Sequence, residues 1–478
     1  MSQKRQLVSN SVSMLVNKLV QGGTSFILTA AIARSLGAEA LGQYLLALSY
    51  FYIFVNIASQ GLKTLFTREV SIQPEKTAAY LISGTLLQFF LSIIGYASMV
   101  LVIYLLPYSD EASFVSYILG LTIIPFALSN ITESILQAQE EMHLIAISTA
   151  PIYILRVLVM IWVMSQKFGI AYVAGIFVVS ELLIFIIQWL LLISKIKPKW
   201  QIDLDFMRSM LLSARTLFAI EGMGIVASKI DILSLSLLGS EFLLGLYGAV
   251  GQLMQPFGLI SKSLTLAAFP RMSKAIQFGK EQQRQEAENT IKLLLCMGLP
   301  FFVGIMVFSD EILIFVYNNA SFLQANTIIK LFAFMLIPTI FSSVFSYVLI
   351  ANGLEKFALV EVSIATILGA LSSIVFIPLY ELLGAALASL VMSLSSLIFL
   401  IYAMHKKLFL INLWKVINLP LMISSLMLAV LLILKQINID FWYVILLSIG
   451  AYLLIVFLTA VHEFGGIEKF RQSIKNRQ

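Results

Sequence analysis

Residues 78–106 read AAYLISGTLLQFFLSIIGYASMVLVIYLL, a run that contains no charged side chain. A helix needs about 20 largely apolar residues to cross the hydrocarbon of a bilayer, so this run is long enough to span one. Similar runs recur along the chain and predict about 14 transmembrane helices. The predicted segments are 10–34, 40–62, 78–106, 114–136, 144–165, 170–193, 213–238, 243–268, 291–308, 323–350, 357–378, 384–404, 414–434 and 441–461. The short connections leave no room for a soluble domain, which predicts an all-α polytopic membrane protein.

The overall composition supports the same class. Hydrophobic residues make up 60% of the 478 residues and charged residues only 12%. Soluble proteins average about 45–50% apolar and about 25% charged residues, so a soluble fold could not cover this much apolar surface. The net charge of +6 fits basic loops on one side of a membrane better than a nucleic-acid surface. The single cysteine, Cys296, excludes an intramolecular disulfide.

The basic residues predict an orientation. They gather in alternate connections and in the C-terminal tail, whereas the opposite connections carry acidic residues such as Asp110, Glu111, Asp310 and Glu311. The basic stretches are 63–76, 195–215, 271–292, 406–415 and the tail from 469. The positive-inside rule therefore predicts that both termini are cytoplasmic and that the number of spans is even.

The chain also contains an internal repeat. Gly37-Ala-Glu39 followed by Leu41-Gly42-Gln-Tyr44 recurs as Gly239-Ser-Glu241 followed by Leu244-Gly245-Leu-Tyr247. Later pairings keep the same order, and the offset drifts only from 202 (239 − 37) to 215 (384 − 169). Six helices per copy keep the two copies parallel, related by an axis along the membrane normal, as in transporters with two rocking lobes. The predicted parts are an N-lobe at 1–200, a C-lobe at 201–408, and two further helices with a cytoplasmic tail at 409–478.

Ionisable residues inside membrane spans are costly and usually face a cavity or one another. The candidates of this kind that we select from the predicted segments are Lys18, Arg156, Glu181, Glu221, Lys229, Asp231, Lys262, Lys330 and Glu361. We expect Lys18, Lys229 and Lys262 to attract an anionic group of a substrate. Glu221 and Asp231 would balance that charge or bind a coupling cation.

An alternative reading remains for each of these residues. They could form salt bridges between helices, or extend a long side chain to the membrane surface. Lys262 and Lys330 lie close enough to segment ends for the second alternative. Arg156, Lys330 and Glu361 are secondary candidates for the cavity.

Motifs for other chemistry are lacking. Gly279-Lys280 is followed by Glu281 rather than Ser or Thr, so it does not form a phosphate-binding loop, and ATP hydrolysis is not expected. Asp203 and Asp205 have a carboxylate spacing used for metals but lie in a short basic connection, which favours a solvated loop. The three histidines have no metal-ligand spacing, and no cofactor is predicted.

The chain resembles the polysaccharide-transport branch of the multidrug/oligosaccharidyl-lipid/polysaccharide exporter superfamily. The likeness begins at residues 10–42, which contain Arg34-Ser-Leu-Gly37, and continues in Leu41-Gly42-Gln-Tyr44. Phe269-Pro270-Arg271-Met-Ser273 and Ala351-Asn352-Gly353 are similar to second-lobe signatures of that family. The likeness covers essentially the whole chain, and its specificity lies in the order of the motifs.

The resemblance implies a MATE-like pair of six-helix lobes that work by alternating access. The implied function is that of a flippase, not an enzyme, for an undecaprenyl-diphosphate-linked oligosaccharide in a bacterial cytoplasmic membrane. Cavity cations would come from the first, second, seventh and eighth segments, which fits Lys18, Lys229 and Lys262. The second segment departs from this pattern, because it carries Gln60 and other polar residues in place of a cation.

The implied partners are membrane lipids, a coupling H⁺ or Na⁺, and a polysaccharide polymerase with its chain-length regulator. A drug or organic-cation antiporter of the same superfamily is the principal alternative, although Lys18 stands where such proteins often have an acid. A membrane-embedded glycosyltransferase or polymerase is a further alternative, but the large outer loop expected of one is not predicted here. A peptidoglycan-precursor flippase would be expected to have more intramembrane arginines.

Overall fold

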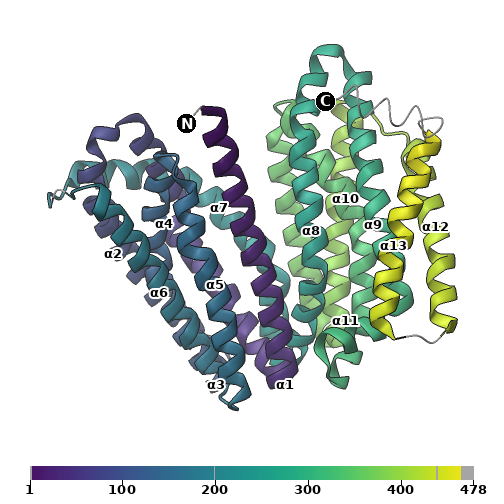
Figure 1. The fold of residues 1–478 in the computed structure, drawn as a ribbon, viewed down its shortest axis with the longest axis horizontal. Helices are drawn as coiled ribbons and strands as arrows, with labels where there is room; N and C mark the ends of the chain where they lie inside the picture. Colours follow the sequence, from purple (N-terminus) through teal and green to yellow (C-terminus); the bar gives the residue numbers. More distant parts are fainter. Residues whose placement is uncertain (1–2, 199, 438–439, 464–478) are drawn as a thin grey trace. The chain divides into compact units, whose positions relative to one another are not determined.

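The computed structural model describes the backbone of residues 3–198, 200–437 and 440–463, and the side chains of these residues except 3–9, 60, 215–221, 223 and 456–463. Within these ranges the chain is helical and has no strand (Figure 1). The helices are α1 Gln3–Ile72, α2 Thr77–Leu105, α3 Asp110–Gly120, α4 Ile123–Ala138, α5 Met142–Ser165, α6 Ile170–Lys195, α7 Leu204–Leu238, α8 Glu241–Ala275, α9 Lys280–Tyr317, α10 Asn326–Ala351, α11 Glu355–Lys407, α12 Leu413–Ile437 and α13 Phe441–Glu463.

Ten helical stretches of the described chain are long and apolar enough to cross a membrane. This confirms the predicted class of all-α polytopic membrane protein, while the number of 14 spans stays a prediction. Two of the ten stretches each contain two predicted segments, because α1 bends at Gly37 and α11 bends at Glu381. Gly37 has φ +88°, a conformation that glycine adopts without the steric penalty of a Cβ atom.

The predicted segment 114–136 is divided into α3 and α4. The break falls at Leu121 and Thr122. Pro125 lacks the backbone N–H that would otherwise bond to the carbonyl of Leu121 in a continuous helix. A single proline therefore shortens the hydrogen-bond ladder where the sequence pattern predicted one uninterrupted span.

The described chain forms two compact units. The first combines Met1–Gln252 with Ser373–Ala385, and the second combines Leu253–Ser372 with Ala386–Gln478. In the first unit α1 packs against α2, α3, α4, α5 and α7. In the second unit α9 packs against α10 and α12, and α12 packs against α13. Lobe boundaries at residues 200 and 408 stay predictions, because packing in one conformation does not define a repeat.

Two repeat-related helix ends cross closely within the first unit. A Cβ atom on Gly42 of α1 would overlap the backbone carbonyl of Glu241, and one on Gly245 of α8 would overlap that of Ala38. Ala38 and Glu241 differ by 203 (241 − 38), as do Gly42 and Gly245 (245 − 42). The contact is therefore reciprocal, and a glycine on each helix lets the two backbones approach, as is common between membrane helices.

Candidate functional site

The predicted cation Lys229 lies where α7 packs against α1. Its ammonium nitrogen is 5.7 Å from the ring centroid of Tyr52, and the side chain is half-buried. Asp231, two residues further along α7, accepts a 2.8 Å hydrogen bond from the Tyr247 hydroxyl of α8. Attraction by Asp231 and by the face of the Tyr52 ring thus helps to keep the Lys229 charge inside a helical bundle.

The other predicted residues are distributed over both units. Lys18 belongs to the first unit and is exposed. It lies on the part of α1 that precedes the bend at Gly37, which is called the N-terminal arm of α1 below. In the second unit Lys262 is exposed on α8, Lys330 is half-buried on α10, and Glu361 is buried on α11 next to Ser396. The side chains of Glu221 and Gln60 lie outside the described residues. Of these predicted residues, Lys229 and Asp231 lie near enough on α7 to attract each other electrostatically.

Arg156 and Glu181 form a buried ion pair between α5 and α6. The guanidinium nitrogen Nη1 is 2.7 Å from the carboxylate oxygen Oε1, and the two side chains are 9% and 4% exposed. The guanidinium carbon also lies 4.2 Å from the centroid of the Phe177 ring and 4.8 Å from that of Tyr153. The buried pair thereby links α5 to α6.

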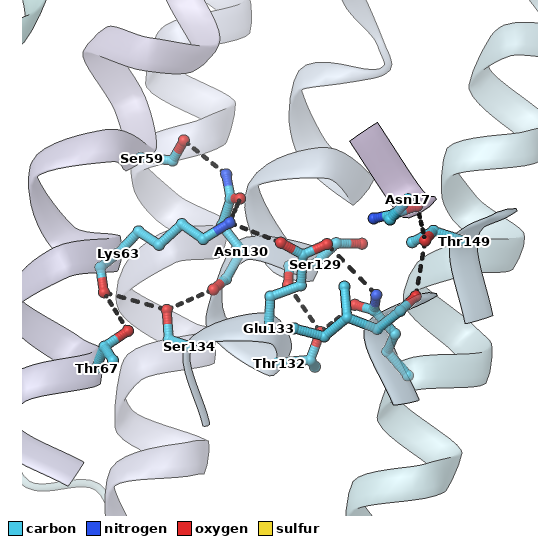
Figure 2. Close-up of polar contacts among 12 residues, drawn as sticks. Asn17, Ser59, Lys63, Thr67, Ser129, Asn130, Thr132, Glu133, Ser134 and Thr149 are labelled. Carbon is cyan, nitrogen blue, oxygen red and sulfur yellow. Dashed lines mark hydrogen bonds and ion pairs between the residues drawn. The ribbon is translucent and has the colours of Figure 1, made fainter. Parts of the chain in front are cut away.

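A second ion pair joins α1 to α4 inside a polar network (Figure 2). Lys63 Nζ lies 2.6 Å from Glu133 Oε2 and donates a 3.1 Å hydrogen bond to Asn130 Oδ1. Asn130 in turn donates to the hydroxyl of Ser59 at 3.1 Å. The side chains of Lys63 and Glu133 are 25% and 18% exposed, so this pair is more accessible than that of Arg156.

The network continues from α4 into α6 and α5. The Thr132 hydroxyl donates to Gln188 Oε1 at 2.6 Å, and Gln188 Nε2 contacts Ser148 Oγ at 3.2 Å and Glu133 Oε1 at 3.5 Å. Buried polar groups require such partners, because an unsatisfied one costs free energy in an apolar interior. Four helices of the first unit are therefore linked by side-chain hydrogen bonds around Glu133.

The network also reaches the N-terminal arm of α1. The Thr149 hydroxyl of α5 donates to Asn17 Oδ1 at 2.8 Å, and both residues are labelled in Figure 2. Asn17 directly precedes the exposed cation Lys18. This hydrogen bond joins α5 to the part of α1 that carries the predicted substrate ligand Lys18.

Lys63 and Glu133 are not among the site residues predicted from the sequence. Lys63 follows the predicted segment 40–62 by one residue and was assigned to a loop. Glu133 lies within the predicted segment 114–136, where an acid inside a membrane span is a signal for a cavity or an ion pair. Their pairing could not be predicted, because the two residues are 70 positions apart.

Hydrogen bonds reinforce the glycine crossing of α1 and α8. Gln43 Nε2 donates to Glu241 Oε2 at 2.8 Å and to Glu111 Oε2 at 3.3 Å. Ser109 also donates to Glu241, and the Tyr108 hydroxyl contacts Ser236 at 3.0 Å. Side chains from α3, α7, α8 and the connection before α3 therefore fasten the helix ends at the acidic connection around Asp110.

An apolar groove lies between α9, α12 and α13 in the second unit. Its volume is about 460 Å³, and four phenylalanines, Phe301, Phe308, Phe315 and Phe441, contribute to its wall. Its polar lining residues are Ser448 and Tyr452, and none of its lining residues is charged. The described cations that could hold an anion therefore lie outside this groove.

The fold is that of a polytopic α-helical membrane protein and is similar to several solved structures. The chain aligns with a lipid II flippase, MurJ, in an inward closed conformation with a TM-score of 0.75 and 17% identity, covering 95% of this chain and 98% of that one. An inward-facing MATE multidrug transporter of the MOP superfamily aligns with a TM-score of 0.63 and 13% identity. The alignment covers 84% of this chain and 98% of the transporter. A MOP superfamily transporter from Pyrococcus furiosus aligns with a TM-score of 0.58 and 13% identity. The alignment covers 84% of this chain and 95% of that transporter.

A family model described as polysaccharide biosynthesis protein matches residues 31–325. This match spans more than half of the chain, so the protein belongs to that polysaccharide biosynthesis family. The predicted resemblance and the MATE-like fold are thereby confirmed. A comparison with curated protein sequences finds no match.

Proposed function

We propose that this protein is a flippase for an undecaprenyl-diphosphate-linked oligosaccharide, working by alternating access in a bacterial cytoplasmic membrane. The observation that carries the proposal is the half-buried ammonium of Lys229 within a helix of a polysaccharide-family membrane protein. A charged side chain inside a membrane-spanning helix costs free energy, and this cost favours a functional role for Lys229.

The substrate presents a specific physical problem. A diphosphate carries negative charge that is strongly hydrated, and its passage through hydrocarbon without compensation costs a large free energy. Lys18, Lys229 and Lys262 supply ammonium groups that offset this cost. Asp231 and Glu221 limit the excess positive charge, and the lipid tail stays in the bilayer. The transfer breaks no covalent bond, so the protein acts as a transporter rather than an enzyme.

The cationic cavity predicts the effect of two substitutions. Lys229→Ala and Lys18→Ala should each lower the initial rate of transfer by about 10- to 100-fold, the effect of losing a hydrogen bond between charged groups. The measurement is protected transfer of an undecaprenyl-diphosphate oligosaccharide into reconstituted liposomes. Lys195→Ala is a suitable control, because Lys195 forms its ion pair with Glu141 at an exposed position.

The results separate the proposal from its principal alternative. Transfer by the natural protein, lost in the Lys18 and Lys229 variants and kept in the Lys195 variant, supports a flippase. Export of small organic cations under a proton or sodium gradient, without transfer of the lipid-linked oligosaccharide, would instead indicate an antiporter.

A further inference from the structure

A polar cleft lies at one end of the first unit, where α1 ends and where α2 and α7 begin. Its volume is about 510 Å³, and sites for small ligands usually have volumes of about 300–1,000 Å³. Five charged residues of both signs line it: Arg68, Lys76, Glu69, Asp203 and Asp205. The cleft is thus large enough for a small polar ligand and offers it both cations and anions.

Packing between α2 and α7 holds the wall of this cleft in place. The Phe206 ring of α7 stacks on the Tyr80 ring of α2, with the ring centroids 3.9 Å apart and an interplanar angle of 10°. The backbone N–H of Asp203 donates a 2.9 Å hydrogen bond to Ser83 Oγ of α2. Asp203 Oδ1 accepts a 2.8 Å hydrogen bond from the N–H of Phe206 and so caps α7. The start of α7 is therefore fixed against α2, and the cleft is part of the packed structure.

The charged side chains of the cleft do not neutralise one another. Within the part of the chain that the structure describes, no ion pair or side-chain hydrogen bond is formed by Arg68, Lys76, Glu69 or Asp205. Gln73 also lines the cleft, and its Oε1 accepts a 3.3 Å hydrogen bond from the Tyr80 hydroxyl. The two N–H donors of the Gln73 amide remain for another partner. One ligand with separate positive and negative groups would satisfy all of these side chains.

Large apolar side chains are exposed beside the cleft. Trp200, Ile202 and Leu204 alternate with polar residues along the chain that leads into α7, and their exposed fractions are 82%, 59% and 70%. Tryptophan is enriched where a membrane meets water. The adjoining helix α2 belongs to a stretch that is long and apolar enough to cross a membrane, Pro74–Leu105. A cleft at the end of such a stretch, next to exposed apolar side chains, lies at the level of the lipid headgroups.

We propose that this cleft binds the headgroup of a zwitterionic phospholipid with a primary ammonium group, such as phosphatidylethanolamine. Arg68 and Lys76 bind the phosphate, as basic pockets between membrane helices bind other lipid headgroups. Glu69 and Asp205 accept hydrogen bonds from the ammonium, and the acyl chains lie against Trp200 and its apolar neighbours. A purely anionic lipid or a free phosphate is disfavoured, because carboxylates line the same cleft. The bound lipid links the end of α1 to the start of α7.

Native mass spectrometry of the full-length protein in detergent tests the headgroup specificity. Delipidated protein is titrated with phosphatidylethanolamine, phosphatidylcholine or phosphatidylglycerol that have identical acyl chains, and the dissociation constant of the first bound lipid is compared. We expect phosphatidylethanolamine to bind about tenfold more tightly than the other two, because only its ammonium donates hydrogen bonds to carboxylates. Equal affinities for the three lipids would overturn the proposal, and so would a preference for phosphatidylglycerol.

Two substitutions at exposed positions test the two ends of the headgroup separately. Arg68→Gln should weaken the binding of phosphatidylethanolamine and phosphatidylglycerol alike by about tenfold, because both lipids have a phosphate. Asp205→Asn should weaken the binding of phosphatidylethanolamine by a similar factor and leave that of phosphatidylglycerol unchanged or tighter. A general loss of structure would instead weaken both, and an equal loss in Asp205→Asn would contradict the assigned role. Lys195→Ala, which removes an exposed ion pair outside the cleft, should change neither affinity.

Soluble glycerophosphoethanolamine distinguishes a lipid site from a site for a free zwitterion. It has the same headgroup but no acyl chains, so we expect it not to displace phosphatidylethanolamine even in large molar excess. Binding as tight as that of the whole lipid would show a site for a soluble molecule and would refute the lipid proposal. None of these measurements depends on transport, so their failure would leave the proposed flippase function unaffected.

Discussion

The variant Arg156→Met, with Glu181 left in place, should be less stable than the natural protein by about 3–5 kcal/mol. The substitution removes the guanidinium that lies 2.7 Å from a carboxylate that is only 4% exposed. The carboxylate is then left in the interior without its ion-pair partner, and the cost of an uncompensated buried charge exceeds the net value of the intact pair. Equilibrium unfolding in mixed detergent micelles, followed by tryptophan fluorescence, measures the difference.

The double variant Arg156→Met with Glu181→Leu provides the decisive control. Replacing both charges by apolar residues of similar size is often neutral, so most of the lost stability should return. Lys195→Ala breaks a pair whose side chains are 43% and 27% exposed and should change stability by less than about 1 kcal/mol. If the double variant were as unstable as the single one, lost packing rather than an isolated charge would be responsible.

The variants Gly42→Ala and Gly245→Ala should each lower the Tm, although alanine is normally the better helix former. A Cβ atom at either position overlaps a backbone carbonyl of the opposite helix, which cannot move aside as a side chain could. Overpacking of this kind typically costs about 1–3 kcal/mol and outweighs the gain of about 0.5–1 kcal/mol expected from alanine in a helix. Thermal unfolding of the purified protein in detergent gives the Tm of each variant.

Gly175→Ala is the matched control for these two variants. Gly175 lies within α6, and a Cβ atom built there has no other atom within 4 Å. The same chemical change should therefore leave the Tm unchanged or raise it. A Tm at or above that of the natural protein for Gly42→Ala would show that α1 and α8 do not pack closely at this crossing.

Much of the fold followed from local pattern in the sequence. The run at 78–106 and its counterparts predicted helices that cross a bilayer, because each backbone polar group in hydrocarbon must be satisfied within its own segment. The segments 10–34 and 40–62 correspond to the two arms of α1 on either side of Gly37. The break at Leu121 was not predicted, because apolar periodicity alone does not reveal which proline interrupts a hydrogen-bond ladder.

The candidate site was predictable only in part. Lys229 and Asp231 were selected from the sequence because charged residues are conspicuous in an apolar helix, and they do share a cluster with aromatic residues of α1 and α8. Lys63 and Glu133 were missed because one lies at a segment boundary and the other is a single acid among polar residues. Which lysine faces which carboxylate depends on how helices rotate and pack, which sequence spacing does not specify.

Composition and the order of short motifs were enough to predict the membrane class, the repeat and the family. The sequence also paired Gly42 with Gly245 as equivalent positions of the repeat. Only the tertiary structure decided that these two positions contact each other's helix, and that Glu133 neutralises Lys63 across 70 residues. The sequence shows which positions are equivalent in the two copies of the repeat. Which positions are in contact depends on the close approach of helix backbones and on the burial of charged side chains, and both arise only when the helices pack.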